Sequence, residues 1–266
     1  MFGININKKI MAAIGIGVLA MGLIAGCGSS NKETVQEGVL RVGSETTFPP
    51  FEYTDDQGKA IGFDVDLSQA IADKLGLKME FVPMGFDALI PAVNSGSIDM
   101  IAAGMNATPD REKAADFSDV YFNEGGFTAV VRKDNNDIHG IDDLKGKVVG
   151  VQVGSVPVEM ARKLPASQVK EIDSNSQIFM ELKAGTIDGA ILDNAVAMFY
   201  LKQGADADLK LVGEPTKSEG INLGFKKGNT KLRDDVNKAL QELKADGTYQ
   251  KIYEKWFGEY KGQLNK

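Results

Sequence analysis

Cysteine and histidine are nearly absent from this sequence of 266 residues, which contains one of each. A cysteine-rich zinc site, an iron–sulfur cluster and a disulfide framework are therefore excluded, because each needs several such residues. A Ser-His-Asp triad would depend on His139, which lies in a stretch of Asn, Asp and Gly residues typical of an exposed loop. The sequence also lacks a glycine-rich phosphate loop and a metal-ligand cluster. We expect no metal and no cofactor.

Basic residues are outnumbered, since 30 Lys and Arg against 37 Asp and Glu give a net charge of −7. Residues 1–26 hold two of the lysines and no acid, so 28 basic and 37 acidic residues leave the rest at −9. Nucleic-acid binding requires a basic patch, and we expect no nucleic-acid partner. With 43% hydrophobic and 25% charged residues, the composition is that of a globular protein.

Long apolar runs are limited to residues 10–23, which follow two lysines. This run is too short and too rich in glycine for a membrane span of about 20 residues, and it is typical of a signal peptide. The residues up to Cys27 (IAGC) then resemble the bacterial lipobox. The resemblance implies cleavage before Cys27, a diacylglycerol on its sulfur and a fatty-acyl chain such as palmitate on its new amino group, which together anchor a protein durably. The alternative is an ordinary secretory signal with a cysteine there by chance.

From residue 39 onward, short strands alternate with helices. Strands are expected at 39–43, 79–82, 98–103, 148–153, 169–172, 187–192, 209–212 and 221–225. Helices are expected at 64–75, 86–94, 155–164, 177–183, 195–202 and 231–257, the last one broken at Gly247. This alternation predicts an α/β class, in which ligands bind beyond the carboxyl ends of the strands. Residues 95–99 (SGSID) resemble residues 184–188 (AGTID), which suggests two lobes of similar design.

Six motifs occur along the chain in the order of one known family. They are residues 47–53 (TFPPFEY), 62–67 (GFDVDL), 104–111 (GMNATPDR), 116–119 (DFSD), 191–194 (ILDN) and 253–258 (YEKWFG). Over residues 40–257 the sequence resembles the periplasmic-type amino-acid-binding proteins of ABC importers, solute-binding protein family 3. It is similar to the branch that binds glutamine, arginine and lysine/arginine/ornithine.

The resemblance implies a two-lobed periplasmic-binding-protein (Venus-flytrap) fold of type II, with two hinge strands. It places a signal peptide at 1–26 and a flexible tether at 27–38. The first lobe is expected at 39–121 plus 222–266, and the second at 122–221. Hinge bending is expected near residues 121–125 and 217–221. The lobes would close on one amino acid.

Two residues in these motifs suit the charged ends of a free amino acid. Arg111 carries a planar fork that can pair a carboxylate through two hydrogen bonds, and the matching family residue binds the ligand α-carboxylate. Asp193 ends an apolar run, and the matching family residue binds the α-amino group. Without the resemblance, Arg111 would be interpreted as a surface residue paired with Asp110 or Glu112.

Four further residues are expected around those charged ends. Gly104 matches a position whose backbone carbonyl accepts from the ligand ammonium. Asn106 departs from the family, which usually has Thr or Ser there, so its longer side chain changes the local geometry. Ser155 and the backbone N–H of Val156 begin a helix of the second lobe and would close over the carboxylate. Val156 replaces a position often held by small or polar residues, so only its backbone is expected to contribute.

The remaining predicted residues surround the ligand side chain. Phe48 and Phe86 match aromatic walls, which suit aliphatic stems, amides and cations. Glu45 matches an acidic position near the ligand's distal polar group, and Gln152 lies where relatives carry Lys or Gln. Glu45 would attract a cationic side chain (Lys, Arg, ornithine or His), whereas Glu45 and Gln152 together would recognise glutamine, and both options remain open. An acidic ligand is disfavoured, because two carboxylates would meet in a dry cleft.

The resemblance therefore implies an extracytoplasmic, monomeric protein that is anchored to the membrane by lipid and passes a polar amino acid to an ABC permease. One alternative is a dehydratase-like enzyme on the same fold, with Glu45 or Asp193 as general acid. We expect that the protein is not an enzyme, because pairing with a ligand ammonium would explain both carboxylates without catalysis. A second alternative is a sensor subunit, which would need an attached signalling segment that we do not expect. A lipid-tethered adhesin would explain none of the cleft residues.

Overall fold

The computed structural model describes residues 33–165, 167–217, 219–260 and 262–264. These residues form two five-stranded sheets and one smaller sheet. All of them belong to the unit Lys32–Lys266. The predicted signal peptide, the attachment site at Cys27 and the start of the tether lie outside the described residues. Within the described ranges, no helix combines the length and the apolar character that a membrane span needs.

The first sheet has the strand order β5-β1-β6-β13-β7. β1 runs parallel to β5 and β6 on its two sides, whereas β13 runs antiparallel to β6 and β7. The strands are β1 (Val39–Ser44), β5 (Lys78–Pro83), β6 (Met100–Ile101), β7 (Ala115–Phe117) and β13 (Gly224–Lys226). A small antiparallel sheet is formed by β2 (Thr47–Phe48), β3 (Glu52–Thr54) and β4 (Ala60–Ile61).

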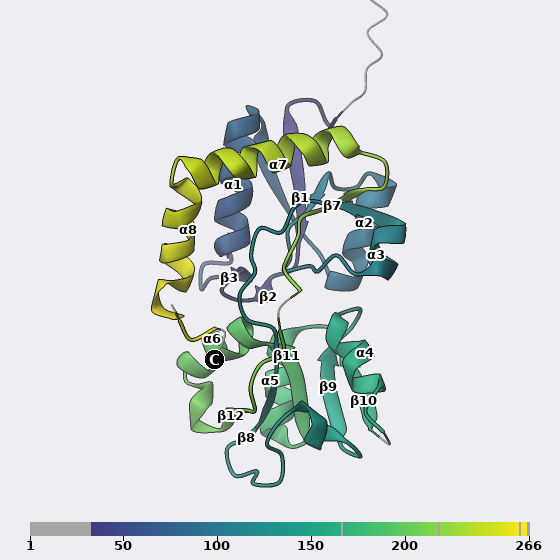
Figure 1. Ribbon diagram of the computed structural model, residues 1–266, viewed down its shortest axis with the longest axis vertical. Coiled ribbons are helices and arrows are strands. Elements are labelled where there is room, and N and C mark those ends of the chain that lie inside the picture. The colour runs from purple at the N-terminus through teal and green to yellow at the C-terminus, as the bar shows by residue number, and fades with distance from the viewer. Residues whose placement is uncertain (1–32, 166, 218, 261, 265–266) are drawn as a thin grey trace, which may run out of the picture. The chain divides into compact units, whose positions relative to one another are not determined.

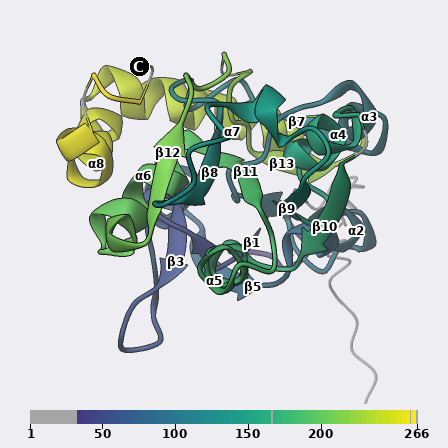
Figure 2. The ribbon, with the colours of Figure 1, turned by 90° about the horizontal axis from the view of Figure 1, so that it is seen from below.

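The second sheet has the order β10-β9-β11-β8-β12, with β12 and β10 at its edges (Figure 2). β9 runs parallel to β10 and β11, and β8 runs antiparallel to β11 and β12. The strands are β8 (Phe127–Arg132), β9 (Val148–Gln152), β10 (Gln168–Ile172), β11 (Gly189–Asp193) and β12 (Leu209–Val212).

Both sheets therefore follow the same plan. Each has a parallel set of three strands, and the strand that comes first in the sequence lies between the other two: β1 between β5 and β6, and β9 between β10 and β11. The repeated segments 95–99 and 184–188 hold equivalent places, before β6 and before β11. In the first, the Asp99 carboxylate accepts from the backbone N–H of Arg41 in β1 at 2.8 Å. In the second, Asp188 accepts from the N–H of Val148 in β9, also at 2.8 Å. The repeat thus ties the third strand of each set to the first.

Helices cover both sheets (Figure 1). The first sheet, the small sheet and their helices form the first lobe: α1 (Phe63–Leu75), α2 (Leu89–Ser95), α3 (Pro109–Ala114), α7 (Thr230–Ala245) and α8 (Thr248–Phe257). The second sheet forms the second lobe with α4 (Val156–Arg162), α5 (Asn175–Ala184) and α6 (Asn194–Lys202). Short 3₁₀ turns are η1 (Phe86–Ala88), η2 (Ile141–Leu144), η3 (Ala205–Ala207) and η4 (Gly258–Tyr260).

An aromatic core holds the first lobe together at the point where the chain leaves it. Phe122 lies on the crossing between β7 and β8, and its ring centroid is 5.0 Å from that of Phe51 and 4.7 Å from that of Phe257. Phe63 lies 5.2 Å from Phe257. The C-terminal helix α8 therefore supplies an aromatic face to this core, and burial of such rings is a major source of stability.

The chain crosses between the lobes twice, between β7 and β8 and between β12 and β13. The crossings pair with each other, because the N–H of Tyr121 donates to Ile221 O at 3.0 Å and the N–H of Ile221 donates to Phe122 O at 2.8 Å. The resemblance predicted two connections of this kind.

Some predicted elements are shorter or begin elsewhere. The strand predicted at 98–103 is shorter, since β6 covers only Met100–Ile101, although the N–H groups of Asp99 and Ala102 still donate to carbonyls of β1. The helix predicted at 155–164 ends at Arg162. Ser155 is its N-cap residue, but its hydroxyl donates to Gln152 O at 2.7 Å instead of accepting from the helix. The helix predicted at 64–75 begins one residue earlier, at Phe63.

Candidate functional site

A pocket lies where strands of both sheets end. β9 ends at Gln152 and β11 ends at Asp193, while Gly104 and Asn106 follow β6. The first strand of each parallel set has neighbours on both sides, which is the switch point where α/β sheets bind ligands. The lining residues are Phe48, Phe86, Gly104, Asn106, Arg111, Phe127, Gln152, Ser155, Val156, Pro157, Asn175, Ile191, Leu192 and Asp193.

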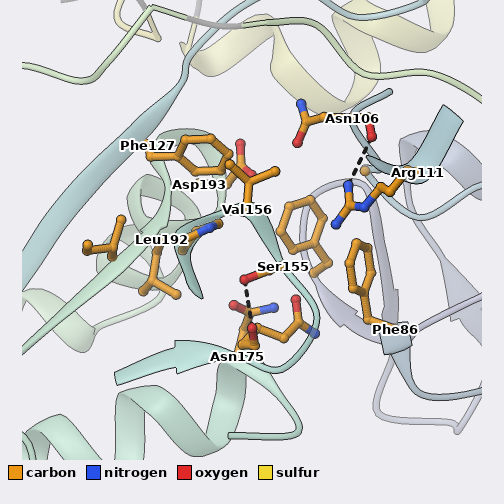
Figure 3. A pocket seen from close by; sticks show the side chains of 14 residues that line it. Phe86, Asn106, Arg111, Phe127, Ser155, Val156, Asn175, Leu192 and Asp193 are labelled. Atoms are coloured by element: carbon orange, nitrogen blue, oxygen red, sulfur yellow. Dashed lines mark hydrogen bonds between the residues drawn. The ribbon is translucent and has the colours of Figure 1, made fainter. Parts of the chain in front are cut away.

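The structure brings together nine of the ten predicted binding residues at this pocket, and the tenth, Glu45, contacts one of them. In Figure 3, Arg111 and Phe86 lie on one side of the pocket, and Asp193, Phe127 and Val156 on the other. Among the described residues, no group of His, Cys, Asp and Glu side chains could hold a metal ion.

Arg111 contributes a half-buried cation that pairs with no carboxylate of the described residues. Its guanidinium donates to Asn106 O and to Gly154 O, both at 2.9 Å, and lies 5.2 Å from the centroid of the Phe86 ring. Burial lowers the pKa of Arg111 to about 10. Among the described residues, Arg111 pairs with neither Asp110 nor Glu112, the partners considered as an alternative, and Asp110 pairs with Lys113 at 2.6 Å.

Asp193 contributes the opposite charge. Within the described part of the chain, no side chain donates to its carboxylate. Asp193 is the N-cap residue of α6, but its side chain makes no capping hydrogen bond. Burial raises its pKa to about 7. Asp193 faces Phe127 across the β11–β8 pair, and this places an aromatic ring beside the carboxylate. A ligand ammonium would supply the missing partner and favour ionisation.

Gly104 and Asn106 shape the first-lobe side of the pocket. A side chain at Gly104 would collide with the ring of Phe48, so the absence of a Cβ lets this ring cover the strand end. Asn106 Nδ2 donates to Gly220 O on the returning crossing at 2.7 Å. The departure from Thr or Ser at this position therefore links the pocket to a segment that joins the lobes.

Glu45 occupies a buried polar corner at one end of the site. Its carboxylate accepts from Gln152 Nε2 at 2.7 Å, and from Thr47 Oγ1 and Asn175 Nδ2 at 3.3 Å each. Burial raises its pKa to about 7 against these three hydrogen bonds. Glu45 itself is not one of the lining residues, but Gln152 and Asn175, which donate to it, are.

Contacts between the lobes surround the pocket. Arg111 of α3 donates to Gly154 O, and Gln152 of β9 donates to Glu45. The N–H of Asn175 donates to Thr47 Oγ1 at 3.2 Å, and Tyr200 OH donates to Thr47 O at 3.3 Å. The lobes therefore touch each other directly at both ends of the site.

The sequence did not identify every lining residue. Phe127 and Asn175 were missed, as were Pro157, Ile191 and Leu192. Ser174 accepts from Gln177 N and so marks the start of α5, which places Asn175 at the first helical position. That helix start was the one signal for Asn175 in the sequence. Phe127 has no local motif, since its position depends on the pairing of β8 with β11.

This fold and this pocket define a two-lobed binding protein with one site between its lobes. Residues 40–259 match the model of a family described as bacterial extracellular solute-binding proteins, family 3. The chain belongs to this family, whose members act outside the cytoplasm.

Curated relatives match almost the whole chain. The arginine-binding extracellular protein ArtP of Bacillus subtilis is 36% identical, over 88% of this chain and 92% of that protein. The L-cystine-binding protein TcyA of the same organism is 34% identical, over 95% of this chain and 98% of that protein.

Solved structures match as well. A structure described as an ancestral arginine-binding protein bound to arginine is 52% identical, with a TM-score of 0.80, covering 83% of this chain and 98% of that one. These relatives are binding proteins, not enzymes. One similar structure, 39% identical with a TM-score of 0.76, is an ancestral amino-acid-binding protein described as a precursor of cyclohexadienyl dehydratase; it covers 83% of this chain and 96% of that one.

Proposed function

We propose that the protein captures one polar amino acid outside the cytoplasm and delivers it to an ABC permease, while a lipid on Cys27 anchors it to the membrane. The observation that carries the proposal is the pair of unmatched charges in the pocket. Arg111 has no carboxylate partner and Asp193 has no ammonium partner among the described residues. A free amino acid brings both missing groups.

The α-carboxylate of the ligand would bind Arg111 through the two-pronged guanidinium. In the structure, that guanidinium donates to the backbone carbonyls of Asn106 and Gly154. Ser155 and the N–H of Val156 would approach the same carboxylate from the second lobe. The α-ammonium would bind Asp193, the Gly104 carbonyl and Asn106. Each charge of the ligand would then be met by a group of opposite charge, which offsets the loss of its hydration.

The ligand side chain would lie between Phe48 and Phe86 and extend toward Gln152, Asn175 and Glu45. A cationic side chain would take the charge of Glu45, and glutamine would exchange amide hydrogen bonds with Gln152 and Glu45. The relatives support either option, since they include proteins described as binding arginine. A related structure, 51% identical with a TM-score of 0.78, is described as the ancestral arginine-binding protein bound to glutamine; it covers 84% of this chain and 99% of that one.

The lobes would open and close by bending of the two crossings, near 121–125 and 217–221. We propose boundaries of 39–121 plus 222–266 for the first lobe and 122–221 for the second. The pairing of the crossings at Phe122 and Ile221 supports a shared hinge. Ligand contacts from both lobes would favour the closed state, and the permease would recognise that state.

Calorimetric titration of residues 28–266 against the common amino acids, ornithine and cystine tests the proposal. The protein is first unfolded and refolded to remove any bound ligand. Binding of Lys, Arg, His or ornithine would make Glu45 a charge partner. Binding of glutamine alone would make Glu45 and Gln152 readers of an amide. No heat with any member of the panel would contradict amino-acid capture.

A further inference from the structure

A pair of buried carboxyl groups, Glu52 and Asp64, lies next to the pocket residue Gly104. Glu52 of β3 and Asp64 in the first turn of α1 are 0% and 1% exposed. Their elements are held together by the backbone, because the N–H of Asp64 donates to Phe51 O at 2.8 Å. A side chain at Gly62 would collide with that same carbonyl oxygen. Glycine at this position therefore lets the two carboxyl groups meet.

The two groups differ in their hydrogen bonds. Asp64 accepts from Tyr121 OH at 2.7 Å and from the N–H of Gly104 at 3.1 Å. Both carboxyl oxygens of Glu52 are buried, and no group in the described part of the chain donates to them. Asp64 is the neighbouring charge that acts most strongly on the Glu52 carboxyl. Two ionised carboxylates next to each other in a buried site would repel, whereas a proton on Glu52 would let it donate toward Asp64.

The charges around Glu52 favour the protonated form. The groups that face it are the carboxyls of Asp64, Glu45 and Asp193, and none of them is a cation. Burial, with Asp64 next to it, raises the pKa of Glu52 well above its usual value. Burial raises the pKa of Asp64 less, to about 6, because Tyr121 and Gly104 donate to it. The proton therefore belongs on Glu52 and the charge on Asp64.

Asp64 joins the pocket to the hinge. The N–H of Gly104 donates to Asp64. Gly104 lines the pocket, and the ring of Phe48 packs against its backbone. Tyr121, which also donates to Asp64, begins the first crossing: its N–H donates to Ile221 O, and its carbonyl accepts from Tyr249 OH at 2.6 Å. One carboxylate thus holds a strand end of the binding site and the start of the segment between the lobes.

We propose that Glu52 is a positioning residue that stays protonated in the folded protein and donates a hydrogen bond to Asp64. Asp64 then holds Gly104 and Tyr121 in the geometry for ligand binding. The effect on ligand affinity rests on the proposed function. The protonation of Glu52 and its effect on folding do not.

Infrared difference spectra test the protonation without a ligand. Wild type is compared with Glu52→Gln at about pH 8, above the pKa values of about 7, 6 and 7 of Glu45, Asp64 and Asp193. We expect a carboxylic-acid carbonyl band in wild type that Glu52→Gln lacks. The control Glu80→Gln changes an exposed glutamate and should retain the band. A wild-type spectrum without the band would overturn the proposal.

Denaturant unfolding as a function of pH gives a second test. In wild type the folded state holds a proton on Glu52 that the unfolded state releases above about pH 4.5. The folded state therefore binds more protons than the unfolded state, and stability falls as the pH rises. We expect wild type to lose up to about tenfold in folding equilibrium constant per pH unit relative to Glu52→Gln. Parallel curves for the two proteins would overturn the proposal.

Affinity for whichever amino acid binds tests the positioning role. Glutamine keeps a donor toward Asp64, so Glu52→Gln should bind within about twofold of wild type. Glu52→Leu removes the donor and should bind about tenfold more weakly. Equal affinity in Glu52→Leu, or a loss in Glu52→Gln as large as in Glu52→Leu, would overturn the positioning role. The spectra and the unfolding curves remain decisive if Glu52→Leu does not fold.

Discussion

At the scale of single residues, Arg111 decides whether the pocket holds a carboxylate. Replacing it by Ala would leave the buried α-carboxylate of the ligand without its partner, which we expect to cost about 2–5 kcal/mol of binding free energy. Arg111→Lys keeps the charge but not the planar fork, and should fall between Ala and wild type. Calorimetric titration measures all three.

Arg233 provides the matched control for this prediction. It also carries a guanidinium, but pairs with Asp234 at 2.7 Å on α7, away from the pocket. Arg233→Ala should leave the affinity unchanged. If Arg111→Ala bound as tightly as this control, the carboxylate would be bound elsewhere.

Asp193 should make the affinity depend on pH. Burial raises its pKa to about 7, and the ligand ammonium needs the ionised form. Affinity should therefore fall as the pH drops below about 7, by up to about tenfold per unit. Asp193→Asn should bind weakly and lose this slope. Titrations between about pH 5 and pH 8 test the prediction, and an unchanged slope in Asp193→Asn would contradict it.

A cationic ligand would make Glu45 a second group with the same direction of pH dependence, because its pKa is also about 7. Glu45→Gln separates the two contributions. With this variant, a remaining slope below about pH 7 would belong to Asp193.

The motifs shared with the family were sufficient to place Arg111 and Asp193 at the pocket. Arg111 and Asp193 stand in motifs that fix their place at the end of a strand or the start of a helix. Phe127 and Asn175 depend on which strands pair and on how the lobes meet, and neighbouring residues in the sequence do not encode that. Glu45 was predicted to meet the ligand's distal polar group, and the structure joins it to the pocket through hydrogen bonds from Gln152 and Asn175.

At the scale of elements, the segment after α8 joins the two lobes. Lys202 of α6 pairs with Glu259 at 2.5 Å and lies 4.8 Å from the centroid of the Tyr260 ring. Asn194 Nδ2 donates to Leu264 O at 2.8 Å. This contact supplements the two crossings between the lobes.

Leu264 should carry most of the stability of this contact. It is 1% exposed and belongs to the core of the first lobe. Leu264→Ala should lower the free energy of unfolding by about 2–4 kcal/mol, because it leaves a cavity. Lys202→Ala removes an exposed ion pair and should cost less than about 1 kcal/mol. Urea unfolding of both variants decides the order, and a larger effect of Lys202→Ala would contradict it.

Periodicity and end signals predicted most elements. In α1, Leu67 and Ile71 are buried as their spacing requires, and Gly76 ends the helix in a left-handed conformation. The edges of elements were harder. β6 is shorter than predicted, and the hydroxyl of Ser155 donates to Gln152 O instead of capping the helix. The extent of β6 depends on tertiary pairing, whereas the Ser155 contact is local and competes with the predicted cap.

At the scale of the whole molecule, Cys27 should determine where the protein resides. If the lipobox prediction is correct, Cys27→Ala removes the site of lipid attachment and the protein leaves the membrane fraction. Fractionation of cells that produce each form measures this. Persistence of Cys27→Ala in the membrane fraction would contradict lipid anchoring, and amino-acid binding by residues 28–266 would be unaffected.

The order of the motifs along the chain predicted the two-lobed fold, and the family match confirms it. Neither the sequence nor the fold identifies the ligand side chain, because the corner at Glu45 offers a negative charge and amide groups together. Small changes there would suit different amino acids.

The central claim is that the pocket recognises both charged ends of one amino acid. The most direct measurement is calorimetric titration of the wild-type protein with its best amino acid and with the N-acetyl and carboxamide derivatives of that amino acid. If Asp193 and Arg111 bind the ammonium and the carboxylate, each derivative should lose at least about a hundredfold in affinity, since each strands a buried charge. Binding of either derivative as tight as that of the free amino acid would contradict the account.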